Sequence, residues 1–136
     1  YANGYYTECP DYKHYNTQDD NSFGNYPRNC GFDKVDMTWG HDEYIYEAMK
    51  QGSNICEEGL YLLRYHSFYP WHTPQNGVMA YTELASDFDW LMLPLLKAFQ
   101  KADLYSKTPN LPPQDILEAK YRKLLDLWIP AKQINW

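Results

Sequence analysis

Two histidines and one aspartate stand where the surrounding sequence has the spacing of apolar helix faces. His41 begins a run of apolar residues at helical spacing, and His66 follows Leu63 by three residues. Asp103 follows Phe88 by 15 residues, and 15 steps of about 100° return it to within about 60° of the direction of Phe88. The pattern predicts that three ionisable groups point into the core from three helices. Because a buried charge must be paired or bind a metal, these residues are the first candidates for chemistry.

Two neutral imidazoles and one carboxylate form the ligand set of non-haem iron sites that keep positions open for substrate and oxygen. Cysteine thiolates, which favour structural zinc, are absent from these positions. The paired Glu-x-x-His motifs of ferritin-like di-iron bundles are also absent. A structural interpretation stays open, because a histidine on an apolar face is commonly a hydrogen-bonded core residue. Asp103, near a helix C-terminus, has the alternative of bonding nearby backbone.

Four helices are predicted to position these residues, over roughly 41–50, 58–69, 86–105 and 113–128. Each range carries apolar residues at the spacing of an amphipathic helix. The residues expected on the inward faces are, in chain order, Tyr44, Ile45, Ala48 and Met49; Leu62, Leu63, His66 and Tyr69; Phe88, Leu91, Met92, Leu95, Leu96 and Phe99; and Ile116, Leu117, Tyr121, Leu124, Leu125 and Trp128.

Local signals support these helix limits. Ser86 and Asp89 have the spacing of a capping box at a helix start. Pro70 is expected to end the second helix, and Pro94 to bend the third. Residues 1–40 lack a helical period and are rich in turn-forming Asn, Asp and Gly, so they are expected to be mostly irregular. With no convincing alternation of period two, the predicted fold class is all-α.

Composition limits the function classes. The chain has 136 residues, enough for one domain, and 44% of them are hydrophobic, as in globular proteins. A net charge of −6 argues against binding to a nucleic-acid backbone. No apolar run approaches the roughly 20 residues of a membrane span, and no signal peptide is visible. Three unevenly spaced cysteines suit reduced thiols better than a disulfide framework, so we expect a cytoplasmic protein with no membrane partner.

Several long motifs resemble segments of the myo-inositol oxygenase family. The residues that carry the resemblance read CGFDKVDMTWGHDEY over 30–44, RYHSFYPWHT over 64–73, MLP over 92–94 and KADLYSK over 101–107. The C-terminal pattern of prolines, leucines and a final tryptophan is also similar, and the resemblance extends over roughly residues 20–136.

The resemblance implies an all-helical HD-domain-like bundle with a di-iron centre, which cleaves the myo-inositol ring with O2 to give D-glucuronate. It implies that His41 and His66 bind one iron and that Asp103 is a carboxylate ligand of the centre. It also places His66, Ser67 and Lys107 at the substrate, with Lys107 as the catalytic residue. A lysine beside an iron-bound alkoxide would stabilise its negative charge.

The match to the family is partial. The ligands of the family's other iron, two histidines and a bridging aspartate, lie upstream of every motif present here, so three of six protein ligands are expected. We therefore expect residues 1–136 to be the C-terminal part of one inositol oxygenase domain, monomeric and inactive by itself. His41 and Asp42 resemble the adjacent His-Asp pair of HD domains, but the surrounding motif matches a later position, and Asp42 is not assigned as a ligand.

Two other functions are weighed against this hypothesis. An HD-type phosphohydrolase would use a similar metal pair on a phosphate ester, which calls for clustered cations. Near the proposed ligands the sequence offers chiefly Arg64 and Lys107. The second alternative is a helical interaction module with purely structural histidines. His14 and His72 receive no role.

Overall fold

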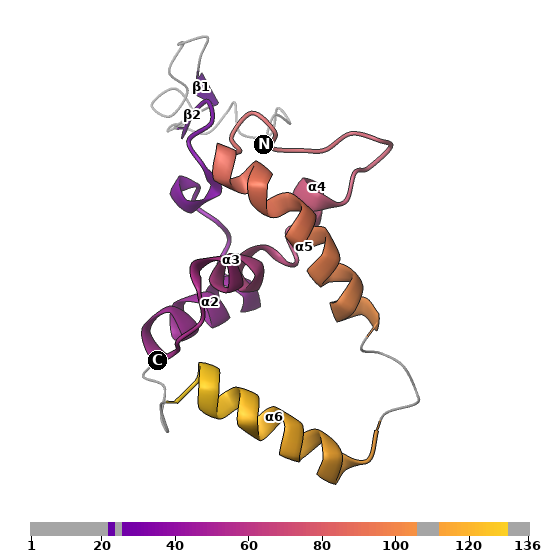
Figure 1. Cartoon of the computed structure of the whole chain (residues 1–136). Coiled ribbons are helices and arrows are strands. Elements are labelled where there is room, and N and C mark those ends of the chain that lie inside the picture. The colour runs from indigo at the N-terminus through magenta and orange to yellow at the C-terminus, as the bar shows by residue number, and fades with distance from the viewer. Residues whose placement is uncertain (1–21, 24–25, 106–111, 131–136) are drawn as a thin grey trace.

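The all-α prediction is confirmed by a computed structural model, which describes residues 22–23, 26–105 and 112–130 (Figure 1). The elements in these ranges are β1 (Ser22–Phe23), β2 (Tyr26–Pro27), the short 3-10 helix η2 (Phe32–Lys34), α2 (His41–Gly52), α3 (Glu57–Tyr65), α4 (Tyr69–His72), α5 (Asp87–Tyr105) and α6 (Gln114–Trp128). The two short strands pair antiparallel, with Phe23 opposite Tyr26. No helix within the described ranges is long and apolar enough to cross a membrane.

The second helix was predicted over residues 58–69, and its predicted end is wrong. In the structure α3 ends at Tyr65, and a separate helical turn, α4, begins at Tyr69. Proline has no N–H, so Pro70 cannot donate the helical hydrogen bond to the carbonyl of His66. Pro70 instead lies in the first turn of α4, where its missing N–H costs nothing. The chain therefore turns sharply between α3 and α4.

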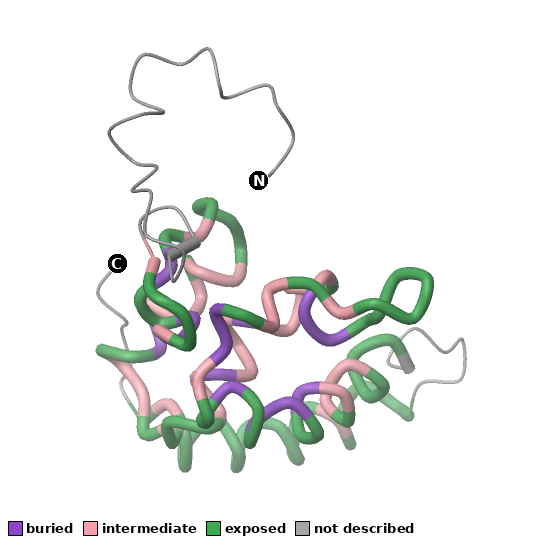
Figure 2. Tube along the Cα trace, turned by 90° about the horizontal axis from the view of Figure 1, so that it is seen from above, coloured by how far each residue is buried: buried purple, intermediate pink, exposed green. Residues whose placement is uncertain are grey.

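The core lies where η2, α3, α4 and α5 meet, and Figure 2 shows the buried segments gathered there. Phe32, Trp71 and Leu96 are completely buried. The ring of Phe32 stands edge-on to Trp71, with centroids 4.9 Å apart, and packs against Tyr65 at 5.9 Å. Such tilted contacts are the preferred geometry of aromatic pairs. Four aromatic side chains, those of Phe32, Tyr61, Tyr65 and Trp71, thus belong to the buried core.

The predicted capping box is present at the start of α5. The backbone N–H of Ser86 donates to Asp89 Oδ2 at 2.8 Å, and the N–H of Asp89 lies 3.3 Å from Ser86 Oγ. Asp89 is buried and also accepts hydrogen bonds from the N–H of Phe32, at 3.2 Å, and from the hydroxyl of Tyr61, at 3.0 Å. One carboxylate therefore joins η2, α3 and α5.

The predicted inward face of α5 is wrong in part. The helix buries Met92, Leu93 and Leu96, whereas Leu91 and Leu95 of the predicted stripe are exposed. The stripe that contacts the core begins at Asp89, because the capping carboxylate faces Phe32 and Tyr61 and fixes the rotation of the helix. Phe88, the first residue of the predicted stripe, is 36% exposed and packs edge-on against Tyr61.

The predicted inward face of α6 is also wrong, because no residue of this helix is buried among the described residues. Leu117 is half-buried, and the other predicted inward residues are exposed. Two hydrogen bonds reach the C-terminal end of α6 (Figure 1): Asn54 donates from its backbone N–H to the carbonyl of Trp128 at 2.7 Å and from its side-chain amide to the carbonyl of Leu127 at 3.3 Å. Apolar spacing marks the face available for packing, but burial also requires a neighbour that covers it.

Candidate metal centre

The candidate site lies between the start of α2 and the end of α3. His41 and Asp42 are the first residues of α2, which follows Gly40, and an acidic residue in a first helical turn is favoured by the helix dipole. His66 is the residue that follows the last turn of α3. The packing of these two helices therefore brings together residues about 25 positions apart in the sequence.

The donor atoms of His41, Asp42 and His66 lie within 4.8 Å of one another. Asp42 Oδ1 is 2.6 Å from Nε2 of His41 and 3.5 Å from Nε2 of His66. Donor atoms bound at about 2.0–2.2 Å to one tetrahedral or octahedral metal are themselves roughly 3.0–3.5 Å apart. The separations in this cluster bracket that range closely enough for a single metal ion.

The carboxylate of Asp42 uses its two oxygens differently. Oδ2 accepts a hydrogen bond from the hydroxyl of Ser67, whereas Oδ1 is buried and accepts no hydrogen bond, despite the nearby imidazole nitrogens. A buried carboxylate oxygen without a hydrogen bond is costly, and a cation would satisfy it. The donor set and the unpartnered oxygen therefore fit a divalent metal.

His66 is oriented by contacts on both its ring and its backbone. Its Nδ1 lies 2.9 Å from the carbonyl of Leu63, which places the proton on Nδ1 and leaves the Nε2 lone pair directed at the cluster. Pro70 has no N–H to donate to the carbonyl of His66, and this carbonyl lies 2.9 Å from Nε2 of His72. His72 is almost fully buried, and this burial lowers the pKa of its imidazole. It is therefore neutral at pH 7.

An ion pair between Arg64 of α3 and Glu43 of α2 joins the two helices beside the cluster. Arg64 donates two hydrogen bonds to the carboxylate of Glu43, at 2.7 and 2.8 Å, and both side chains are largely buried. Burial alone would lower the pKa of Arg64, but the bonds to Glu43 outweigh it and raise the pKa. Since Arg64 is already paired, it offers little to a phosphate, and the phosphohydrolase hypothesis loses its main cation in the described ranges.

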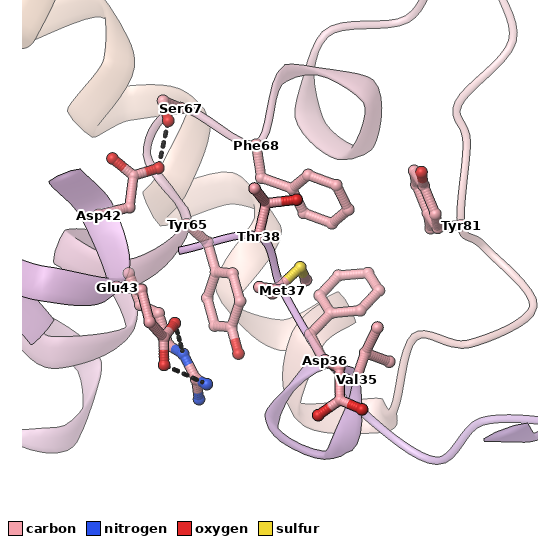
Figure 3. A pocket seen from close by; sticks show the side chains of 12 residues that line it. Val35, Asp36, Met37, Thr38, Asp42, Glu43, Tyr65, Ser67, Phe68 and Tyr81 are labelled. Atoms are coloured by element: carbon pink, nitrogen blue, oxygen red, sulfur yellow. Dashed lines mark hydrogen bonds and ion pairs between the residues drawn. The ribbon is translucent and has the colours of Figure 1, made fainter. Parts of the chain in front are cut away.

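A cavity of about 200 Å³ adjoins the cluster (Figure 3). Asp42 and Ser67 lie together on one side of it, and Tyr81 lies on the opposite side. Its wall combines the rings of Phe68 and Tyr65 with polar groups, an arrangement typical of small-molecule sites. Its volume suits a single-ring ligand better than a drug-sized one.

The predicted site residues have different outcomes. His41 and His66 lie together as expected, but the expectation that His41 points into the core is wrong, because its side chain is 73% exposed. Asp103 is exposed in the last turn of α5 and is not among the three clustered residues. Because its side chain is exposed, the predicted inward orientation of Asp103 is also wrong.

Two further predictions concern the substrate. Ser67 lines the cavity and contacts Asp42, whereas Lys107, the predicted catalytic residue, lies outside the described residues. The sequence analysis considered the adjacent His41-Asp42 pair without assigning Asp42, and it gave His72 no role. In the structure both residues lie beside His66: Asp42 Oδ1 is 3.5 Å from His66 Nε2, and His72 Nε2 is 2.9 Å from the carbonyl of His66.

A helical chain with two imidazoles and a carboxylate gathered beside a small cavity is, by its donor set, a candidate metalloprotein. All of it, residues 1–136, matches the myo-inositol oxygenase family, and the chain belongs to that family.

Three relatives illustrate the match. The inositol oxygenase of Danio rerio is 45% identical over 96% of this chain, and that of Homo sapiens is 45% identical over 79%. The probable inositol oxygenase of Oryza sativa subsp. japonica is 39% identical over 97%. These alignments cover 45%, 37% and 41% of the respective relatives, so the chain spans less than half the length of the relatives it matches.

Proposed function

We propose that this chain forms the C-terminal part of a single HD-domain-like inositol oxygenase, which cleaves the myo-inositol ring with O2 to give D-glucuronate at a di-iron centre. The names of the relatives support the substrate and the reaction class. The observation that carries the proposal is the gathering of two imidazoles around a buried carboxylate oxygen that accepts no hydrogen bond, beside a cavity.

His41 and His66 would each hold iron through a neutral imidazole. The geometry of His66 favours this role, because its Nδ1–H donates a hydrogen bond to the carbonyl of Leu63 and leaves Nε2 free to bind a metal. One carboxylate completes the set: the family resemblance implies Asp103, and Asp42 is the acid nearest to both histidines. Bound iron would acidify a coordinated hydroxyl and supply electrons to oxygen.

The cavity would hold the substrate next to the metal. Its hydroxyl, carboxylate and aromatic groups suit a small polyol, and Ser67 stands where the cavity meets the ligand cluster. The proposal keeps Lys107 as the cation that stabilises negative charge on a substrate oxygen. A fixed position next to the metal would lower the entropic part of the barrier.

With three of the family's six expected ligands, the isolated chain would not hold two irons tightly, so by itself it would be inactive. We propose a monomer in the cytoplasm. The alternative of an interaction module predicts that the histidines are dispensable for metal binding, and this difference can be measured.

The experiment is anaerobic titration of the purified chain with Fe(II), followed by iron analysis after gel filtration. We expect iron binding that is lost in His66→Ala and kept in His14→Ala, which changes a histidine to which the sequence analysis gives no role. Adding myo-inositol, but not sorbitol, should alter the spectrum of the bound metal. Absence of iron binding, or equal binding by His66→Ala, would contradict the proposed metal site. Two tightly held irons with inositol-dependent oxygen uptake would contradict the inactivity of the isolated chain.

A further inference from the structure

We propose that His72 is a positioning residue for the metal ligand His66, acting through a hydrogen-bond chain that runs from α5 through the turn after α4 to the backbone of the ligand. The inference rests on the proposed metal site and assigns a role to a histidine that does not bind the metal itself. Its basis is the arrangement of His66, Pro70, His72, Thr73 and Gln100.

The first step is a carbonyl that the helix cannot satisfy. In a continuing helix, the carbonyl of His66 would accept a hydrogen bond from the N–H of residue 70, and Pro70 has no N–H to give. The Nε2 of His72 lies 2.9 Å from this carbonyl oxygen and takes the place of the missing donor. The side chain of His72 thus supplies the hydrogen bond that the backbone cannot give to the carbonyl of His66.

The second step fixes the proton on the imidazole of His72. A carbonyl can only accept, so the contact with His66 requires the proton on Nε2. Nδ1 is then an acceptor, and the hydroxyl of Thr73 lies 3.2 Å from it. The amide of Gln100, in α5, donates to Thr73 Oγ1 at 3.2 Å. The donors of all three bonds follow one direction, from Gln100 to His66. Thr73 and His72 each accept one bond and donate the next.

The third step concerns the freedom of His66. Its Nδ1 is held by the carbonyl of Leu63 in α3, and its own carbonyl is held by His72, which is 2% exposed. Metal affinity depends on groups behind the ligands, and their loss typically costs 10–100-fold. The turn also contains the bond from the N–H of Phe68 to the carbonyl of Tyr65, at 3.0 Å. Loss of the bond from His72 should therefore loosen the backbone of His66 and, with it, the direction of His66 Nε2.

The first test reads the proton directly in the metal-free chain. Long-range nitrogen–proton NMR correlation of the histidine rings should place His72 in the neutral Nε2–H form, with a slowly exchanging ring proton. An Nδ1–H form of His72, or a ring proton that exchanges as fast as that of exposed His41, would overturn the inference without affecting the proposed function.

The second test measures Co(II) affinity and the visible absorption of bound Co(II) in the full chain. We expect His72→Leu to weaken binding 10–100-fold and to shift the absorption. His72→Gln, which retains an N–H donor, should restore most of the affinity. Thr73→Val changes an exposed residue and should weaken binding by several-fold, so this variant keeps the test informative if His72→Leu does not fold.

Leu84→Ala is the matched control, because it removes buried volume from the same core without touching His66. We expect lower thermal stability in this variant, with the Co(II) affinity of the folded protein within twofold of the unsubstituted chain. Folded His72→Leu with unchanged affinity and spectrum would overturn the positioning role alone. Absence of Co(II) binding by the unsubstituted chain would overturn the proposed metal site and the positioning role together.

Discussion

The hydroxyl of Ser67 donates a hydrogen bond to Oδ2 of Asp42, so that a residue just beyond α3 orients the carboxylate at the start of α2. The other oxygen, Oδ1, is left facing Nε2 of both His41 and His66 without a hydrogen bond. The relationship assigns two tasks to one carboxylate. One oxygen holds its orientation, and the other is available to a cation.

A first prediction follows from this pair. Asp42→Asn should weaken Co(II) or Fe(II) binding at least tenfold, because it removes the negative charge that faces the two imidazoles. Ser67→Ala should weaken it less, since the carboxylate stays but loses its support. Isothermal titration calorimetry measures both effects. Asp36→Asn changes another carboxylate at the same cavity and should have little effect; equal losses in Asp42→Asn and Asp36→Asn would point to general electrostatics.

The second prediction concerns the buried pair of Glu43 and Arg64. Removing one partner leaves the other charge buried and unpaired, so Glu43→Gln should lower the free energy of unfolding by about 3 kcal/mol. The double variant Glu43→Gln/Arg64→Met should recover part of this loss. The exposed pair of Lys50 and Glu47, 3.8 Å apart, is the control, and Lys50→Met should cost less than about 1 kcal/mol. Urea unfolding gives these values, and similar costs for both pairs would refute the prediction.

A third prediction tests the rotation of α5. Leu96 is completely buried and its neighbour Leu95 is 45% exposed. Leu96→Ala should therefore cost about 2–5 kcal/mol of stability, whereas Leu95→Ala should stay within about 1 kcal/mol. The comparison controls for residue type, helix and position. Equal costs at both positions would favour the broader stripe that was predicted from the sequence.

The fourth prediction is a loss of stability in alkaline solution. Burial, with Asp89 nearby, raises the pKa of Tyr61, and burial raises the pKa of Tyr65. Above pH 10 the unfolded chain releases these two phenolic protons while the folded chain keeps them. The folded state then binds more protons, so stability falls as pH rises, by up to about 1.4 kcal/mol per pH unit for each group.

Urea unfolding at pH 9 and at pH 10.5–11 measures this effect. Tyr61→Phe should flatten the decline between these values, and Tyr121→Phe, at an exposed tyrosine in α6, should leave it unchanged. A decline that is the same in all three proteins would show that the buried phenols are not its source.

Much of the local structure could be predicted because its causes are local. The apolar spacing and the flanking Gly and Pro residues gave α2, α5 and α6 to within two residues at each end. Ser86 and Asp89 form their capping box because the two residues are three positions apart on one helix start. The meeting of His41 and His66 agreed with the sequence interpretation, which also relied on the family resemblance.

Tertiary packing alone decided the rest. The stripes of α5 and α6 named residues able to be buried, but the hydrogen bonds of Asp89 set the rotation of α5, and nothing in the described ranges covers α6. Asp103, in the last turn of α5, is exposed and lies outside the cluster, while the packing of α2 against α3 brings Asp42 to His66. A sequence period defines directions around one helix axis, whereas a metal site requires distances between helices, and these exist only once the helices have packed.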